Sequence, residues 1–353
     1  MGLRAAGRIA LLCGSLLACQ GAGIPTNELP ESPIAFSYRA PEEARRRADA
    51  YKDAQEKQVE SAREQIDPET AAAQSTGEIR PSVNQMRDLF GKVLGHGEAG
   101  DAEYPGRLAL LGPRTGVVTV VDAARRGSIP LEWSADRSRL MFAQPGERDF
   151  QIYEYERASG TVRPVTHGPE AHAQACYAAD DRIVVVTAEA QGALRSRIEV
   201  SRAGGRGPFT PLSDWGMAHS PTCSPDGRAV VWTSDSETGR PELLLRSPID
   251  DGETRLLAPG RFPRFSPDGV WIVYTALLKG DYRVWRMRPD GTGRAPIGSG
   301  SRSESRPTVS PDGHFVAYVA AEEVPRHNLY LRRFDGSGDR ILFADGDGEY
   351  PVW

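Results

Sequence analysis

Short apolar segments recur at regular intervals over the C-terminal two thirds of the chain. Three copies share a proline, two residues, the tetrapeptide Ser-Pro-Asp-Gly and an alternating apolar run, at residues 221–234, 263–275 and 307–319. Two weaker copies occupy residues 131–142 and 174–187. This regularity indicates an internal structural repeat. The first tetrapeptide position falls in steps of 44, 46, 42 and 44 residues at Ser134, Ala178, Ser224, Ser266 and Ser310.

Each repeat predicts four short antiparallel strands. In the tetrapeptide, Pro fixes φ, Asp can bond its own backbone and Gly supplies a positive φ, so a tight turn joins two strands. The apolar run that follows is rich in β-branched and aromatic residues, and two further strands come after it, often separated by Asp-Gly. Four short strands in about 44 residues are typical of one blade of a β-propeller.

The chain ends where a sixth repeat would begin. Residues 349–353 correspond to an inner strand, whereas residues 107–111 and 117–122 look like strands with no inner strand before them. We therefore expect both ends of the domain to share one blade. The prediction is an all-β, six-bladed β-propeller over residues 104–353, closed by the C-terminal strand.

The N-terminus has the layout of an export signal. Arg4 and Arg8 precede an apolar stretch of about ten residues, which is too short to span a bilayer. The Leu-Leu-Ala-Cys sequence that follows resembles a bacterial lipobox, in which the cysteine is lipidated after cleavage. We expect residues 1–18 to be a lipoprotein signal peptide and Cys19 to carry the lipid, and Gln20 in place of Asp favours the outer membrane. An ordinary secretion signal is the alternative.

Two polar segments follow the signal. Residues 19–40 contain several prolines and small polar residues, which predicts a flexible tether. Residues 41–103 predict a polar helical arm, whose first helix begins at Pro41 and ends near Pro68. Its apolar stripe is thin, as expected for a spacer or a weak seam with a partner.

Charge and composition exclude several functions. The chain of 353 residues has 43 basic and 48 acidic side chains, a formal charge of −5, so we expect no nucleic-acid partner. It has no Gly-x-Ser-x-Gly, His-Glu-x-x-His or Cys-x-x-Cys motif, so we predict no catalytic residue, metal or cofactor. The acidic run at residues 345–349 lacks the full spacing of a calcium loop and is interpreted as a turn.

Two of the four cysteines, Cys176 and Cys223, remain once the signal is removed and Cys19 is lipidated. An export compartment permits a disulfide between them. They fall near the ends of adjacent inner strands, displaced by one position between blades. Because inner strands of neighbouring blades diverge with channel width, we expect two buried free thiols.

The repeat resembles that of the TolB family of six-bladed propellers, over about residues 106–353. The resemblance rests on the proline and Ser-Pro-Asp-Gly signature and implies the fold and a place in the bacterial envelope. The lipobox and the helical arm depart from the family pattern. Related propellers also occur in peptidases and pectate-degrading lyases, so fold alone does not assign function.

One set of candidate binding residues emerges from the repeat. The residue five places before each Ser-Pro-Asp-Gly position leads into an inner strand, so the six equivalents should ring one channel mouth. Such a ring can receive a peptide or an anionic ligand, although channel mouths also tolerate polar residues that bind nothing. With their neighbours, the candidates are His172, His219, Arg261, Arg306, Glu349 and Tyr350.

These observations predict a membrane-anchored envelope protein whose propeller binds a protein or peptide partner without catalysis. One alternative is a propeller-based enzyme acting on polysaccharide or peptide. Another is a spacer that binds partners through its helical arm.

Overall fold

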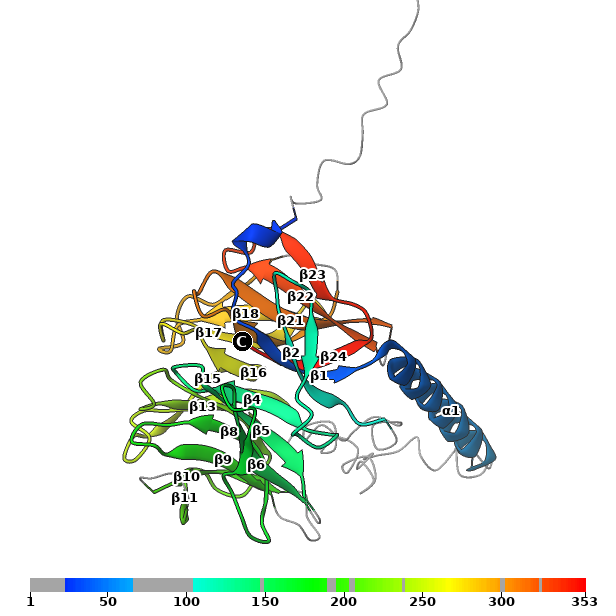
Figure 1. Ribbon diagram of the computed structural model, residues 1–353. Coiled ribbons are helices and arrows are strands. Elements are labelled where there is room, and N and C mark those ends of the chain that lie inside the picture. The colour runs from blue at the N-terminus through cyan, green and yellow to red at the C-terminus, as the bar shows by residue number, and fades with distance from the viewer. Residues whose placement is uncertain are drawn as a thin grey trace, which may run out of the picture.

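The computed structural model describes residues 23–65, 104–146, 149–188, 195–202, 207–236, 239–298, 302–323 and 326–353. Their strands form six sheets of four strands each. The innermost strands contact one another around a ring, which closes between β24 (Asp347–Val352) and β4 (Ile129–Trp133) (Figure 1). The predicted six-bladed propeller closed by its C-terminal strand is confirmed.

The blades are numbered here from the one that holds both ends of the domain. Blade 1 contains, from inside to outside, β24, β1 (Ile34–Arg39), β2 (Arg107–Leu111) and β3 (Val118–Val120). Blade 2 contains β4, β5 (Arg139–Pro145), β6 (Phe150–Glu156) and β7 (Val162–Pro164). Blade 3 contains β8 (Ala171–Tyr177), β9 (Ile183–Ala188), β10 (Ser196–Ser201) and β11 (Phe209–Pro211).

The other three blades repeat this arrangement. Blade 4 contains β12 (Ala218–Cys223), β13 (Val230–Asp235), β14 (Pro241–Arg246) and β15 (Thr254–Pro259). Blade 5 contains β16 (Arg261–Phe265), β17 (Ile272–Leu278), β18 (Asp281–Met287) and β19 (Ala295–Pro296). Blade 6 contains β20 (Glu304–Val309), β21 (Phe315–Glu323), β22 (Arg326–Arg333) and β23 (Asp339–Phe343).

The Ser-Pro-Asp-Gly segments form the expected turns between first and second strands. In blade 4, Ser224 Oγ donates to the Asp226 carboxylate, which also accepts the Arg228 N–H at 3.1 Å, and Gly227 has a φ of 66°. The degenerate copy in blade 2 keeps these bonds, with Arg137 at a φ of 58° in place of glycine. The end of the ring that carries these turns is called the turn end below, and the opposite end is called the pocket end.

The prediction of a flexible tether over residues 19–40 is wrong for residues 34–39, which form strand β1. Residues 34–39 form the second strand of blade 1, where Ala35 pairs with Val352 and Arg39 pairs with Asp347. Ile34, Ala35 and Phe36 are buried, because a strand between two others in a propeller blade is covered on both faces. The predicted strands at residues 107–111 and 117–122 are present as β2 and β3, outside β1.

The residues before β1 also lie against the propeller. Residues 24–33, called the strap here, include the 3₁₀ turn η1 (Thr26–Glu28) and cross the turn end of blades 1 and 6. Ile24 and Leu29 are buried, and their carbonyls accept bonds from Arg340 at 2.8 Å and Arg114 at 2.5 Å. The Trp353 indole N–H donates to the Ser32 carbonyl at 3.0 Å, which joins the strap to the C-terminus.

The helix α1 (Pro41–Gln65) begins where the sequence predicts and leads away from the propeller (Figure 1). Ala44 and Arg47 are buried at its base, whereas most of the side chains described after them are exposed. No helix in the described ranges is both long enough and apolar enough to cross a bilayer. The predictions for residues 1–18, for Cys19 and for the arm over residues 66–103 lie outside the described residues.

Candidate binding site in the central channel

Each inner strand is interrupted by an irregularity at the same repeat position. The register between first and second strands shifts there, for example between His219 and Thr222 in blade 4. Such a bulge bends a strand and changes the direction of a side chain. In four blades the residue at the bulge has a positive φ and precedes a proline; these residues are Ser220 (54°), Phe262 (55°), Arg306 (52°) and Tyr350 (55°).

The bulge residues of all six blades surround one cavity, called the central pocket here. A positive φ is uncommon for residues with a side chain, so four occurrences at equivalent positions indicate a backbone held by its surroundings. The central pocket is lined by Ile129, Pro130, Leu131, Ala173, Gln174, Ala175, Ser220, Pro221, Phe262, Pro263, Arg264, Arg306, Pro307, Tyr350 and Pro351.

Arg306 lies between two aromatic rings of this pocket. Its guanidinium carbon is 4.3 Å from the ring centre of Phe262 and 4.0 Å from that of Tyr350. Both distances are within the range of cation–π attraction, so the two rings hold the guanidinium between their blades. Within the described part of the chain, no carboxylate is paired with Arg306.

Deeper in the channel, Arg264 of blade 5 and Glu132 of blade 2 occupy equivalent positions in blades on opposite sides of the ring. Burial raises the pKa of Glu132 to about 7, although the Tyr177 N–H, 2.6 Å from the carboxylate, and the charge of Arg264 oppose this rise. Burial also lowers the pKa of Arg264; the charge of Glu132 opposes this, and Arg306 acts in the same direction as burial. The channel therefore carries two guanidinium groups and one readily protonated carboxyl.

A second cavity opens at the turn end. Arg264 borders both cavities, whereas Glu132, Trp133, Arg137 and Trp353 border only this one. Arg137 lies 5.0 Å from the Trp133 ring centre and donates to the Pro33 carbonyl at 3.0 Å. The strap therefore contacts the rim of this cavity, while the central pocket lies toward the other end.

Of the predicted mouth residues, the structure places Arg306 and Tyr350 in the lining of the central pocket. His172, His219, Arg261 and Glu349 are not among its lining residues. His219, Arg261 and Glu349 precede bulge residues by one position and pair with second strands. The prediction took the residue five places before each Ser-Pro-Asp-Gly position; in these blades the bulge brings the following residue to the pocket instead.

The two histidines are buried beside the channel. His219 is next to Phe262, with ring centres 6.3 Å apart, and burial lowers its pKa although Asp235 opposes this. Burial likewise lowers the pKa of His172, whose ring is 5.1 Å from that of Phe209. Sequence reasoning missed Phe262 and Arg264; the available signals were the residue before and the residue after the proline that recurs in the repeat.

Glu349 belongs to a different cluster, at the base of α1. Its carboxylate lies 2.8 Å from Arg39 and 3.2 Å from His327 Nδ1, and Asp347 lies 2.9 Å from Arg39 and 2.8 Å from Arg47. Burial opposes a charge on His327, but the two carboxylates raise its pKa to about 10. His327, Asp347 and Glu349 are close enough to share a cation, yet two arginines already neutralise them. The cluster attaches α1 to the propeller.

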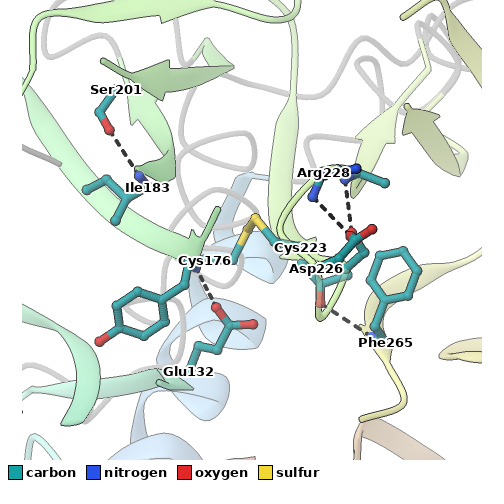
Figure 2. Close-up of a disulfide and its surroundings, with 12 residues drawn as sticks. Glu132, Cys176, Ile183, Ser201, Cys223, Asp226, Arg228 and Phe265 are labelled. Carbon is teal, nitrogen blue, oxygen red and sulfur yellow. Dashed lines mark hydrogen bonds between the residues drawn. A yellow bond between two sulfur atoms is a disulfide. The ribbon is translucent and has the colours of Figure 1, made fainter. Parts of the chain in front are cut away.

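Cys176 and Cys223 form a disulfide, so the prediction of free thiols is wrong (Figure 2). Their Cα atoms are 5.6 Å apart, which is within bonding range. Adjacent inner strands stay close at the turn end, where the Ala179 N–H also donates to the Gly227 carbonyl at 3.0 Å. The disulfide joins blades 3 and 4 beside the channel.

Comparisons with known proteins agree with this architecture. No protein-family model matches the chain. An uncharacterized protein of Agrobacterium fabrum, Atu1656, is 33% identical over 145 residues, which cover 37% of this chain and 49% of that protein. A TolB homolog of Chlorobium luteolum is 32% identical over 107 residues, which cover 29% of this chain and 23% of that protein. The chain thus spans about half the length of the Agrobacterium protein and about a quarter of the length of the Chlorobium TolB homolog.

The crystal structure of TolB from Acinetobacter baumannii superposes with a TM-score of 0.62 at 17% identity, over 91% of this chain and 66% of that one. This chain carries a TolB-like propeller. The TolB-like fold accounts for the ring, the blade order and the central channel. The chemistry of the central pocket depends on the side chains that line it in this chain.

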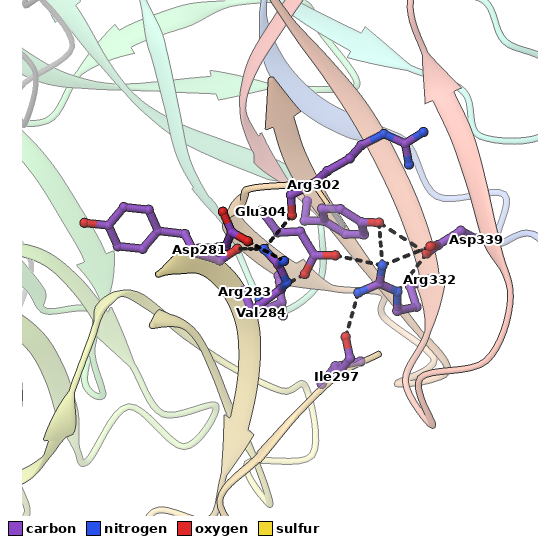
Figure 3. A network of polar contacts seen from close by, with 10 residues as sticks. Asp281, Arg283, Val284, Ile297, Arg302, Glu304, Arg332 and Asp339 are labelled. Atoms are coloured by element: carbon purple, nitrogen blue, oxygen red, sulfur yellow. Dashed lines mark hydrogen bonds and ion pairs between the residues drawn. The ribbon is translucent and has the colours of Figure 1, made fainter. Parts of the chain in front are cut away.

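Blades 5 and 6 of the TolB-like propeller are joined by polar contacts around the buried side chains of Glu304 and Arg332 (Figure 3). Glu304, two residues before Arg306, lies 2.8 Å from Arg332 and accepts the Val284 N–H at 3.1 Å. Arg332 also bonds the Asp339 carboxylate at 2.7 Å and the Ile297 carbonyl at 2.6 Å. These contacts connect β20, the strand that carries Arg306, to blade 5 and to β22 of its own blade.

Proposed function

We propose that this protein is an envelope lipoprotein, anchored through lipid on Cys19, whose TolB-like propeller binds a protein or peptide partner without catalysis. The observation that carries the proposal is the central pocket. Bulges in the inner strands bring Phe262, Arg306 and Tyr350 into one cavity, in backbone conformations that cost energy and are held by the surrounding blades. Aromatic and arginine side chains are the groups that most often dominate protein interfaces.

The TolB homologues and the TolB structure support an envelope role, because they share the fold and, locally, the sequence. The basic residues, short apolar stretch and Leu-Leu-Ala-Cys sequence support export and lipidation. The pocket lining combines prolines, alanines and aromatic rings with few polar groups, which suits a partner's side chain or chain end.

Photocrosslinking in the native envelope tests partner binding. A photoreactive phenylalanine analogue at position 262 retains the ring beside Arg306, and we expect it to crosslink a discrete polypeptide. The matched control places the analogue at Leu256, which is 57% exposed on the outer strand of blade 4. Crosslinks at position 262 that are weakened by Arg306→Gln support the proposal. Identical products at both positions, or none at position 262, contradict it.

Metabolic labelling tests the anchor separately. Labelled palmitate should be incorporated into the wild type and not into Cys19→Ser. The wild type should also fractionate with the outer membrane, and the variant should not. Incorporation of label into Cys19→Ser, or recovery of an unlabelled wild type in the soluble fraction, contradicts lipidation at this residue.

A further inference from the structure

We infer that the central pocket binds a carboxylate group of the partner, supplied by an acidic segment, with Arg306 and Arg264 as the groups that receive it. This inference rests on the proposed function and names the chemistry that the site recognises. The pocket lining contains both arginines and no aspartate or glutamate. The positive charge of the two arginines is therefore not balanced by an acidic side chain in the pocket lining.

The two arginines differ from Arg39, Arg47 and Arg332, the three most deeply buried arginines of the described residues. Arg39, Arg47 and Arg332 are nearly fully buried, and each has a carboxylate within 2.9 Å. Burying a guanidinium without an anion is costly, so these pairs are expected. Arg264 and Arg306 are half-buried in the channel, and among the residues that the structure describes neither forms an ion pair with a carboxylate, although the charge of Glu132 raises the pKa of Arg264.

The surroundings of Arg306 also define how an anion approaches. Phe262 and Tyr350 both lie within cation–π range of its guanidinium carbon, and a guanidinium held against aromatic rings still presents its N–H groups for bonding. A carboxylate accepts two such N–H groups in the guanidinium plane, and this geometry favours arginine over lysine. Pro221, Pro263 and their equivalents in the wall have no N–H to compete for it.

Glu132 acts on Arg264 through its charge but forms no ion pair with it among the contacts of the described residues. It borders the cavity at the turn end rather than the central pocket, and its carboxylate already accepts the Tyr177 N–H at 2.6 Å. Its raised pKa further weakens its charge near neutral pH. Arg264 is thus left with capacity for an anion entering from the pocket end.

Calorimetric titration of the purified protein with end-capped hexaglutamate tests the inference, with end-capped hexaglutamine as the uncharged comparison. We expect hexaglutamate to bind at least about tenfold more tightly, since charge-assisted hydrogen bonds are stronger than neutral ones. Arg306→Gln should lose about tenfold in hexaglutamate affinity. The matched control is Arg240→Gln, an exposed residue at the same end of the ring but outside the pocket, which should bind like the wild type.

Equal affinity for the two peptides, no binding of hexaglutamate, or an unchanged Arg306→Gln variant overturns the inference. Inorganic phosphate that binds as tightly as hexaglutamate also overturns it, because the site then takes free anions. Thermal unfolding of each variant checks folding. If Arg306→Gln does not fold, Arg306→Lys keeps the charge without the planar fork, and we expect several-fold weaker binding. Crosslinking at position 262 without hexaglutamate binding leaves the proposed function standing and removes this inference alone.

Discussion

Burial makes Glu132 a pH-sensitive residue at the centre of the channel. Its pKa is about 7 in the folded protein, whereas an exposed glutamate has a pKa near 4.5. Between these values the folded protein holds a proton that the unfolded chain has released. Stability therefore falls as pH rises through this window, because the charged form is disfavoured only in the folded state.

We predict that Glu132→Gln makes the stability of the folded protein depend less on pH in this window. The variant stays neutral, so the loss in urea midpoint between about pH 5 and about pH 8 should be smaller than in the wild type. His327, whose pKa is raised to about 10, adds stability that is lost as pH rises from about 6.5. It is unchanged in the variant, so the difference between the two profiles isolates Glu132. Parallel profiles would contradict the assignment.

At the scale of single elements, the disulfide between β8 and β12 should stabilise the ring. It closes a loop with a sequence separation of 47 residues. We predict that Cys176→Ser with Cys223→Ser lowers the free energy of unfolding by about 3–4 kcal/mol, measured by urea titration. Alkylation of the unreduced, denatured wild type should leave both cysteines unmodified. Modification of both by mass would contradict the bond.

The attachment of α1 gives a second prediction at this scale. Arg47 is buried and lies 2.8 Å from Asp347, which retains Arg39 when Arg47 is removed. We predict that Arg47→Met costs about 2 kcal/mol and exposes the base of α1 to protease, while the propeller resists. Arg46→Met is the matched control, because Arg46 is exposed and, among the residues that the structure describes, its ion pair is with exposed Glu42. Equal cleavage rates in both variants would contradict the role of Arg47.

The elements that the sequence predicted are those that repeat. Five turns at even spacing defined the blades, and the unfinished sixth repeat predicted closure by the last strand. Strand β1 has no turn signature and lies among prolines, so composition indicated a tether. Its pairing with β2 and β24 crosses more than 60 residues and 300 residues of sequence, and local patterns do not report such contacts.

Prediction of the candidate site was limited in the same way. Repeat alignment brought Arg306 and Tyr350 to one end of the channel, but it could not show that a bulge turns the following residue inward. The pairing of Cys176 with Cys223 depended on the spacing of adjacent inner strands, which is a property of the closed ring. Both corrections come from backbone geometry rather than from residue chemistry.

In the whole molecule, β1 connects the strap at one end of the ring to α1 at the other end. It runs from the turn end, where Ala35 pairs with Val352, to the pocket end, where Arg39 pairs with Asp347. The strap therefore lies at the turn end and α1 begins at the pocket end. Cys19 is only five residues before buried Ile24, so at most about 18 Å separates them. Under the proposed anchoring, the turn end faces the membrane and the central pocket faces away from it.

Energy transfer to a labelled lipid tests this orientation. Val270→Cys and Lys279→Cys place a dye at the turn end and at the pocket end of β17, about 30 Å apart. In phosphatidylethanolamine and phosphatidylglycerol vesicles carrying a rhodamine lipid, the lipidated protein should show at least about twofold more transfer from position 270. Lengthening the chain by about twenty flexible residues after Gln20 should remove the difference, because the strap then no longer restricts the distance to the bilayer. Equal transfer from the two positions in the unmodified chain would show that the propeller is not oriented, and a reversed order would place the pocket against the membrane.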